Sequence, residues 1–355
     1  MTVVVNKKAI VIGGLGVTGR YIISELISQK IWDVVGISRS KPNVNSTVPF
    51  LSVDINDENQ SLEVLSKIEG ITNVFYTARD DRGDLSQQAI KNGKMLSNVI
   101  NALQHSNNSI EHIHLMHGMK AYGNFLGPFK TPALETDPRI PINLSYYAQE
   151  DVLIRLQEKV SWSWSTLRPG AVLGVTLGYS GNLISIIGFY ASICKYMGWP
   201  LWYPGTEAGF NALRQTCNAE LLAKAAVWVS TKKNCVNQSF NVHNGDLFRW
   251  RDLWPQIADF FKIKNAGPLN LRLNDLMKDK DLIWKEIAKK NDLCVVDLNN
   301  SVSWDYSNVF HNSWDSFADS NKIKATGFIE SANSTESILK YLRQLQIEKI
   351  IPKVE

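Results

Sequence analysis

Short apolar and β-branched runs alternate with longer segments of helical periodicity through the first half of the chain. The runs that predict strands are residues 9–12, 34–38, 73–76, 112–116 and 163–167. Apolar residues recur at helical spacing in the segments 18–29, 91–105 and 147–159. This alternation is typical of parallel βαβ units, so we expect an α/β fold of the Rossmann type, with a doubly wound parallel sheet. Ligands of such sheets bind at the carboxyl ends of the strands.

The alternation ends after Pro169, where aromatic residues become frequent and one more short strand is expected near 239–242. We therefore expect residues 1–170 to form a dinucleotide-binding Rossmann domain. Residues 171–355 should form a smaller C-terminal part, integrated with the first, that mainly builds the substrate pocket. The aromatic residues of segment 190–203 fit either a pocket wall or an ordinary core, because buried aromatic runs are usually packing.

Composition narrows the class of protein. The 355 residues are 44% hydrophobic and 20% charged, which is typical of a globular protein. The net charge of +4 comes without a lysine or arginine run, which argues against nucleic acid or a membrane surface as partner. The N-terminal residues lack the pattern of a secretory signal, so we expect a cytoplasmic protein.

Two further features have structural rather than catalytic interpretations. The four cysteines are scattered without CxxC spacing, which predicts free thiols instead of a disulfide or zinc framework. The most apolar stretch, residues 183–194, is shorter than the roughly 20 residues that a bilayer requires. We expect it to form a wall or lid of the pocket and no membrane insertion.

A glycine-rich turn, GGLGVTG at residues 13–19, follows the first predicted strand and opens the first helix. Glycines allow a tight turn, and the helix N-terminus offers free N–H groups to a pyrophosphate. The spacing fits GxGxxG, with Gly14, Gly16 and Gly19, or GxxGxxG, with Gly13 in place of Gly14. Either pattern predicts a dinucleotide site.

The end of the second strand indicates which dinucleotide is bound. Sites that prefer NAD place an acidic residue there, but this chain has Ser38, Arg39 and Ser40. Arginine and serine suit a 2′-phosphate, which predicts NADPH. Asp54, beside Ile55, follows the third strand and fits either a contact to the adenine or a helix cap.

The tyrosine of a short-chain dehydrogenase is normally followed by a lysine four residues later, and that lysine is missing here. Tyr146 and Tyr147 are followed by Glu150 and Asp151, which we expect to be solvated helix charges. A carboxylate at this position would raise the pKa of the tyrosine. Another cation is needed, and Lys120, just beyond the strand 112–116, is well placed to supply it.

The chain resembles the progesterone 5β-reductase and iridoid synthase family of atypical short-chain reductases. The motifs that carry the resemblance are GMKAY at 118–122, GPF at 127–129, YYAQED at 146–151, YASICK at 190–195, FNVHNGD at 240–246 and KIIP at 349–352. These motifs span nearly the whole chain. The resemblance implies reduction of the C=C bond of enones and enals with NADPH, by hydride addition to the β-carbon of a small hydrophobic, terpenoid-like or steroid-like substrate.

The resemblance also implies roles for residues. Tyr146 would bond the carbonyl oxygen and Lys120 would place positive charge beside it, because conjugate addition develops an oxyanion there. The residues expected to contact the cofactor are Gly13, Leu15, Gly16, Val17, Thr18, Gly19, Ser38, Arg39, Ser40, Asp54, Ile55, Thr77, Ala78, Met116, Lys120, Tyr146, Pro169 and Val172. Those expected to contact the substrate are Tyr122, Phe125, Phe129 and Ile338.

Two departures from the family pattern leave alternatives open. Segment 123–125 looks like an insertion, and the stretch from Phe129 to Tyr146 is correspondingly shortened. This loop lines the pocket in the family, so the native substrate could differ. Tyr147 is the fallback for the catalytic tyrosine. A ketone reductase and a non-enzymatic NADPH-binding regulator are the rival functions, although a regulator needs neither Lys120 nor Tyr146. The oligomeric state is open, a homodimer being one possibility.

The histidines at 112, 114 and 117 suggest a metal site, because the first two share one face of a strand. Zinc needs three or four convergent ligands, and no cysteine or carboxylate with ligand spacing is near them in the sequence. We expect core or surface histidines and no metal.

Overall fold

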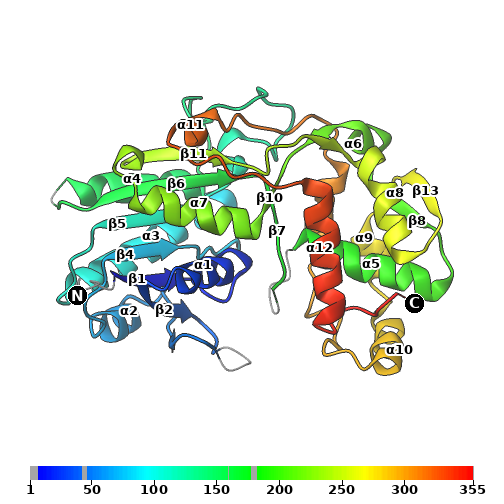
Figure 1. Ribbon diagram of the computed structural model, residues 1–355, viewed down its shortest axis with the longest axis horizontal. Helices are drawn as coiled ribbons and strands as arrows, with labels where there is room; N and C mark the ends of the chain where they lie inside the picture. The colour runs from blue at the N-terminus through cyan, green and yellow to red at the C-terminus, as the bar shows by residue number, and fades with distance from the viewer. Residues whose placement is uncertain (1–6, 42–45, 159, 177–181, 355) are drawn as a thin grey trace.

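The structure, a computed structural model, describes residues 7–41, 46–158, 160–176 and 182–354. A seven-stranded sheet in the order β11-β6-β5-β4-β1-β2-β3 fills one half of the molecule, and neighbouring strands in it are parallel (Figure 1, left). Its strands are β1 (Lys7–Ile12), β2 (Trp32–Ser38), β3 (Phe50–Ser52), β4 (Asn73–Tyr76), β5 (His112–Met116), β6 (Ser163–Pro169) and β11 (Gln238–Val242). Every strand predicted from the sequence is in this sheet, which confirms the Rossmann-type fold.

Helices cover both faces of the sheet because its strands are apolar on both sides. Ala9 and Val11 of β1 pack into one core, whereas Ile10 and Ile12 pack into the other. The helices in the first core are α1 (Val17–Ser28) and α7 (Ala219–Thr231). The helices on the opposite face are α2 (Glu58–Leu65), α3 (Leu85–Gln104) and α4 (Ser145–Gln157). The predicted helices correspond to α1, α3 and α4.

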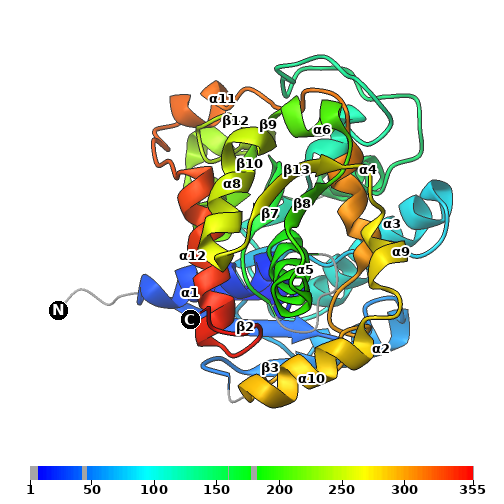
Figure 2. The same ribbon diagram turned by 90° about the vertical axis from the view of Figure 1, so that its right-hand side faces the viewer.

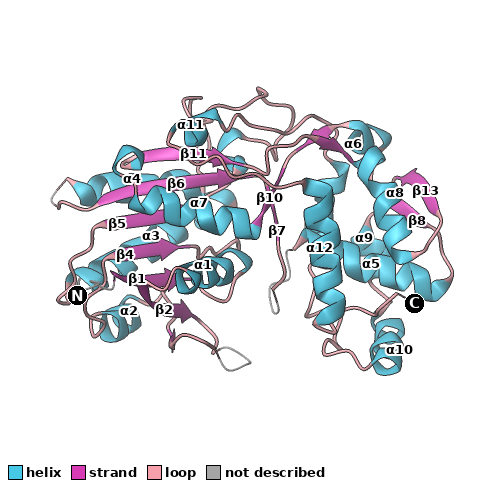
Figure 3. Ribbon diagram, viewed as in Figure 1, coloured by secondary structure: helices cyan, strands magenta, loops and turns pink. Residues whose placement is uncertain are grey.

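The remaining elements form a mainly helical part beside the sheet (Figures 2 and 3). Its helices are α5 (Leu183–Met197), α6 (Glu207–Asn211), α8 (Trp250–Phe261), α9 (Leu273–Met277), α10 (Asp281–Asn291), η3 (Trp304–His311) and α12 (Ser334–Ile347). A two-stranded sheet of β8 (Leu201–Pro204) and β13 (Asn265–Leu269) lies among them. We call this region the helical part.

The other elements are short. They are η1 (Met119–Tyr122), β7 (Ala171–Leu173), β9 (Leu213–Arg214), β10 (Thr216–Asn218), η2 (Lys233–Cys235), β12 (Phe248–Arg249) and α11 (Asn321–Ala325). Although α7 and β11 follow residue 170, they pack in the sheet region. A division of the sequence at residue 170 therefore does not coincide with the division in space.

The apolar helix α5 lies in the core of the helical part. Its residues 183–194 are all buried, and α8, α10 and α12 pack around it. The burial of this whole segment contradicts a lid, whereas a place in the wall of the pocket stays a prediction. Within the ranges that the structure describes, no helix is both long and apolar enough to cross a membrane.

The aromatic segment after α5 also forms core. Tyr190 and Tyr203 are fully buried, and their hydroxyls donate to backbone oxygens of Trp202 and Phe310 at 3.1 and 2.7 Å. Tyr203 makes edge contacts with Trp254 at 5.3 Å and with Phe310 at 5.4 Å between ring centroids. Of the two interpretations of this segment, packing is therefore the better one for these tyrosines.

Candidate active site

The glycine turn between β1 and α1 is shaped by its neighbours. Gly13 has φ +83°, and a Cβ on it would lie 2.8 Å from Thr77 Oγ1 and 2.9 Å from the nitrogen of Ala78. A Cβ on Gly19 would lie 2.3 Å from the Gly13 oxygen. Gly13 therefore needs both a left-handed backbone and a missing side chain, which favours the GxxGxxG pattern. Thr77 and Ala78, as expected, lie beside the turn.

The start of α1 suits an anion. Gly16 is its N-cap residue, and no side chain among the described residues caps it. The first N–H groups of the helix, at Val17, Thr18 and Gly19, are therefore available to a phosphate, together with the positive end of the helix dipole. The backbone of Leu15 is held by Thr176, whose hydroxyl donates to its oxygen at 3.0 Å. The turn has the shape and polarity that a dinucleotide pyrophosphate requires.

Positive charge lies beyond the end of β2. Arg39 is exposed, and the Ser52 hydroxyl donates to its backbone oxygen at 2.7 Å. The side chain of Ser38 instead bonds the backbone oxygen of Ser40. Hydrogen bonds from Asn56 are the main cause that lowers the pKa of Asp54, and the charges of Arg39 and of the exposed Arg82 lower it further. Arg82 is itself paired with Asp80. Sequence reasoning missed Arg82.

Asp54 forms a local turn. Its carboxylate accepts from the backbone nitrogen of Asn56 at 3.1 Å and from its side-chain amide at 2.9 Å. The cap of α2 is Asp57, so the capping alternative for Asp54 is wrong. Ile55 is buried in the core, and its backbone oxygen accepts from Asn98 at 3.0 Å. Cofactor contacts by Asp54 and Ile55 stay predictions.

Tyr146 lies in the first turn of α4 and is buried. Its hydroxyl oxygen accepts a hydrogen bond of 2.6 Å from Nη1 of Arg79. The tyrosine ring stacks on His117, with 4.6 Å between ring centroids. Burial raises the pKa of Tyr146, whereas the charge of Arg79 opposes this rise. The hydroxyl is therefore held protonated beside a cation.

Tyr147 has a different environment. Its hydroxyl donates to the oxygen of Ala121 at 2.7 Å and accepts from the nitrogen of Ile140 at 3.1 Å. Both bonds go to backbone groups, so this hydroxyl anchors the loop that precedes α4. Of the two tyrosines, Tyr146 is the better candidate for contact with a substrate.

Lys120 lies in the short helix η1, directly after β5, and is half-buried. Its ammonium group is 5.7 Å from the centroid of the Phe125 ring. Burial lowers the pKa of Lys120, the nearby charge of Arg79 lowers it further, and Asp81 opposes both. Arg79 and Asp81 act in the same directions on the pKa of Tyr146, so the structure brings both predicted catalytic residues beside one ion pair.

Sequence reasoning missed this ion pair of Arg79 and Asp81. Nε and Nη2 of Arg79 lie 2.7 Å from the two carboxylate oxygens of Asp81. The signal was available, because charged residues directly follow β4 at the carboxyl edge where ligands of parallel sheets bind. Without the tertiary structure, these residues resemble an ordinary charged loop.

Glu150 corrects another expectation. It is buried instead of solvated, and it pairs with Arg168 at 3.0 Å and with Arg139 at 2.9 Å. Burial alone would raise the pKa of Glu150, but the charge of Arg168 and the hydrogen bonds from Arg168 and Arg139 lower it overall. Asp151 is exposed, as expected, and also pairs with Arg139, at 2.7 Å. The carboxylate after the tyrosine motif is thus neutralised by arginines.

The other expected cofactor residues follow or end strands at the same edge. Met116 ends β5, Pro169 ends β6, and Val172 lies in β7. The positions agree with the expectation, while contact with a cofactor stays a prediction for each.

The four expected substrate residues lie in different environments. Tyr122 is buried, and its hydroxyl donates to Asn241 Oδ1 at 2.6 Å, which makes it part of a structural network. Burial raises the pKa of Tyr122 to about 12. Phe125 and Phe129 are half-buried. Ile338 is fully buried in the core of the helical part, in a different cluster from Phe129. A substrate contact therefore suits Phe125 and Phe129 better than Tyr122 or Ile338.

Segment 123–125, which we expect to be an insertion, is bonded to the segment between η3 and α11. Gly123 ends η1 with φ +74°, and the Trp314 indole nitrogen donates to the Asn124 oxygen at 3.1 Å. The position of this segment between Lys120 and Phe129 suits a part of the pocket wall.

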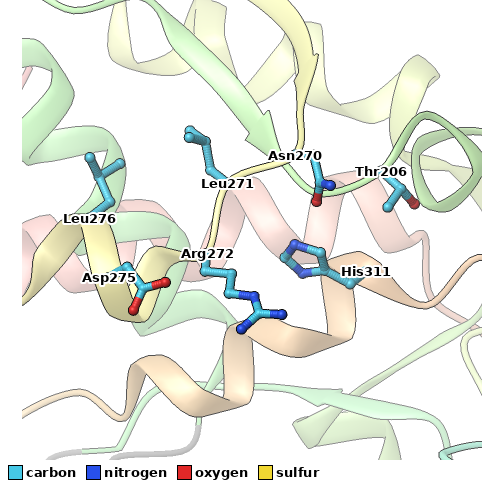
Figure 4. Close-up of a pocket in the computed structure, with 7 residues that line it drawn as sticks. All are labelled: Thr206, Asn270, Leu271, Arg272, Asp275, Leu276 and His311. Atoms are coloured by element: carbon cyan, nitrogen blue, oxygen red, sulfur yellow. The ribbon is translucent and has the colours of Figure 1, made fainter.

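A separate hollow of about 740 Å³ lies in the helical part (Figure 4). Its lining residues are Thr206, Asn270, Leu271, Arg272, Asp275, Leu276 and His311. None of the predicted site residues lines it.

The histidines of β5 are structural, and the one that follows this strand is buried. His112 bonds Ser163 and Ser165, each at 2.8 Å, and His114 bonds Ser165 at 2.9 Å. Burial lowers the pKa of His117 to about 3, so its ring under Tyr146 is neutral. In the described part of the chain, no group of three or more His, Cys, Asp or Glu residues could hold a metal ion.

Known proteins support the resemblance. A family described as a PRISE-like Rossmann-fold domain matches residues 39–337. The (S)-8-oxocitronellyl enol synthase ISY1 of Nepeta racemosa is 30% identical over 97% of this chain and 93% of its own. The 3-oxo-Delta(4,5)-steroid 5-beta-reductase of Arabidopsis thaliana has the same identity and coverage.

Solved structures agree on the fold. A putative epimerase from Burkholderia cenocepacia superposes with a TM-score of 0.68 at 16% identity, covering 96% of this chain and 98% of its own. A UDP-glucose 4-epimerase from Thermotoga maritima gives 0.67 at 15% identity, with 95% and 99% coverage. Because the family match and the relatives at 30% identity span most of the sequence, this chain belongs to the PRISE-like Rossmann-fold family of progesterone 5β-reductases and iridoid synthases.

Proposed function

We propose that the protein is an NADPH-dependent reductase that saturates the activated C=C bond of a hydrophobic enone or enal. The observation that carries the proposal is the buried Tyr146 hydroxyl, which accepts a hydrogen bond from Arg79. The charges of Arg79 and Asp81 act on the pKa of Tyr146 and also on that of Lys120. The relatives support the substrate class, since their names describe an 8-oxocitronellyl enol synthase and a 3-oxo-steroid 5-beta-reductase.

The proposed cofactor site uses the glycine turn and the start of α1 for the pyrophosphate. Ser38 and Arg39 would take the 2′-phosphate, with Arg82 adding positive charge at the same corner. When bound, NADPH supplies the hydride that the β-carbon of the substrate accepts. The absence of an acidic residue at the end of β2 supports NADPH over NADH.

The catalytic residues would act on the carbonyl oxygen. Addition at the β-carbon moves the electron pair of the C=C bond towards this oxygen, and an enolate develops. Tyr146 donates a hydrogen bond to the oxygen, and Lys120 places a positive charge beside it, which lowers the energy of the transition state. The α-carbon then takes a proton from solvent, so the tyrosine need not lose its own. Phe125 and Phe129 would face the apolar body of the substrate.

Turnover of a compound panel tests the proposal. Purified protein is mixed with NADPH and with cyclic enones, enals and simple ketones, and cofactor oxidation and products are measured. We expect saturated carbonyl products from enones or enals. Alcohols from simple ketones would identify a carbonyl reductase instead. NADPH binding without turnover of any compound would support a regulator.

A further inference from the structure

Arg79 is oriented by an ion pair and aimed at the Tyr146 hydroxyl. Two of its nitrogens lie 2.7 Å from the two oxygens of Asp81, which fixes the plane of the guanidinium group. The third nitrogen, Nη1, is 2.6 Å from Tyr146 Oη. The side chain of Arg79 is 29% exposed, so the guanidinium group links the buried Tyr146 hydroxyl to the protein surface at the carboxyl edge of the sheet.

The direction of this hydrogen bond matters for chemistry. A guanidinium group can only donate, so Tyr146 Oη accepts in this bond and the hydroxyl proton stays free for another acceptor. A cation bonded to the phenol oxygen also stabilises the negative charge that grows there when the proton is shared. Arg79 therefore makes Tyr146 a directed and stronger donor.

The groups around Tyr146 support this assignment. The titratable or charged groups that act on it are Arg79 and Asp81 after β4, and the His117 ring after β5 stacks on it. Lys120 on η1 interacts with the same Arg79 and Asp81. His117 is neutral, because burial lowers its pKa to about 3. Glu150, on the same helix as Tyr146, is neutralised by Arg168 and Arg139. Arg79 is thus the cation in direct contact with the hydroxyl.

We propose that Arg79, held by Asp81, is a positioning residue that orients and activates the Tyr146 hydroxyl as hydrogen-bond donor to the substrate oxygen. It takes over the role of the lysine that this chain lacks four residues after the tyrosine. The catalytic part of this proposal rests on the proposed reductase function, but the coupling between Arg79 and Tyr146 can be measured without turnover.

Fluorine NMR of protein labelled with 3-fluorotyrosine measures this coupling. The signal of Tyr146 is identified by its loss in Tyr146→Phe, and its titration is followed with pH. Arg79 lowers the pKa of Tyr146 and Asp81 raises it. We therefore expect Arg79→Gln to move the titration of Tyr146 to higher pH and Asp81→Asn to move it to lower pH. An unchanged titration in Arg79→Gln overturns the proposal, whatever the activity.

Kinetics then test the catalytic role. Arg79→Gln should lower kcat on an enone about 10-fold to 100-fold, the usual contribution of a charge-assisted hydrogen bond. Arg79→Lys keeps the positive charge but cannot make the paired hydrogen bonds to Asp81, so its kcat should lie between those of Arg79→Gln and the wild type. NADPH affinity should not change. The matched control is Arg155→Gln, an exposed arginine on the same helix as Tyr146, which should retain normal kcat.

A double variant separates action through Tyr146 from a general structural effect. If Arg79 acts through the hydroxyl, Arg79→Gln should cost much less in a Tyr146→Phe background than in the wild type. Equal losses in both backgrounds overturn the proposal. The wild-type protein could reduce no enone while Arg79→Gln still shifts the titration of Tyr146. This result would overturn the reductase function and retain the Arg79–Tyr146 coupling.

Discussion

The carboxyl edge of the sheet and the helical part use their side chains in opposite ways. At the edge, Arg79, Lys120 and Tyr146 bring two cations and a hydroxyl together near the surface. In the helical part, aromatic residues such as Tyr203 and Trp254 are fully buried among one another. The candidate catalytic residues therefore lie at the carboxyl ends of the strands, whereas the many aromatic residues of the second half stabilise the core of the helical part.

The largest effect is expected on stability, for a substitution in the core of the helical part. Trp254→Ala should lower the free energy of unfolding by about 3–5 kcal/mol, because it empties a large volume of a closed core. Urea unfolding measures the loss. The NADPH dissociation constant of the remaining folded protein should be unchanged. A specific loss of substrate affinity at normal stability would instead place this aromatic cluster in the pocket.

Tyr146→Phe tests the edge directly. It should lower kcat on enones by about 100-fold to 1000-fold, because one preorganised donor to the oxyanion is lost. Ketone reduction should suffer more, since an alkoxide must receive a proton. The matched control is Tyr147→Phe, which loses bonds to Ala121 and Ile140 and should affect stability more than turnover. A loss of turnover in Tyr147→Phe alone would transfer the role to that residue.

Lys120→Met should cost a factor similar to that of Tyr146→Phe on the same enones. The double variant should lose less than the product of the two factors, because both groups act on one developing oxyanion. Steady-state kinetics of the four proteins measure the interaction. Independent, multiplicative losses would mean that Lys120 and Tyr146 serve different steps.

Arg39→Ala tests the proposed 2′-phosphate site at the end of β2. It should weaken NADPH binding about tenfold, in line with the loss of one charge-assisted contact to phosphate, and leave NADH binding nearly unchanged. Fluorescence titration of both cofactors measures this difference. Equal affinities for the two cofactors, unaltered by the substitution, would exclude a 2′-phosphate site at Arg39.

The smallest effect is expected for Phe129→Ala, at the border between the two regions. It should change relative kcat/KM values across an enone panel by less than about tenfold, the lower end of what one apolar contact contributes, because the Phe129 side chain is only half-buried. NADPH affinity should stay the same. An unaltered order of substrates would assign Phe129 to ordinary packing with Met119 and Ala133.

Periodicity was sufficient for the sheet region. Strand β1 packs into a core on each face, so it is recognisable in the sequence as a short continuous apolar run. The same reasoning failed for α5, because an apolar segment has the same composition whether it forms a lid or a core. Burial depends on what packs against the segment, and α8, α10 and α12 come from distant parts of the sequence.

Sequence alone determined the fold class and the glycine turn, because both depend on local spacing along the chain. Tyr146 and Lys120 were singled out by the resemblance of their motifs to a known family, and their catalytic roles stay predictions. Tertiary structure decided which tyrosine hydroxyl is free of backbone partners, that Glu150 is buried and paired, and that Arg79 contacts Tyr146. Arg79 and Tyr146 are 67 residues apart. Only the parallel packing of β4 beside β5 brings the segments that follow these strands to one edge, where a hydrogen bond can form.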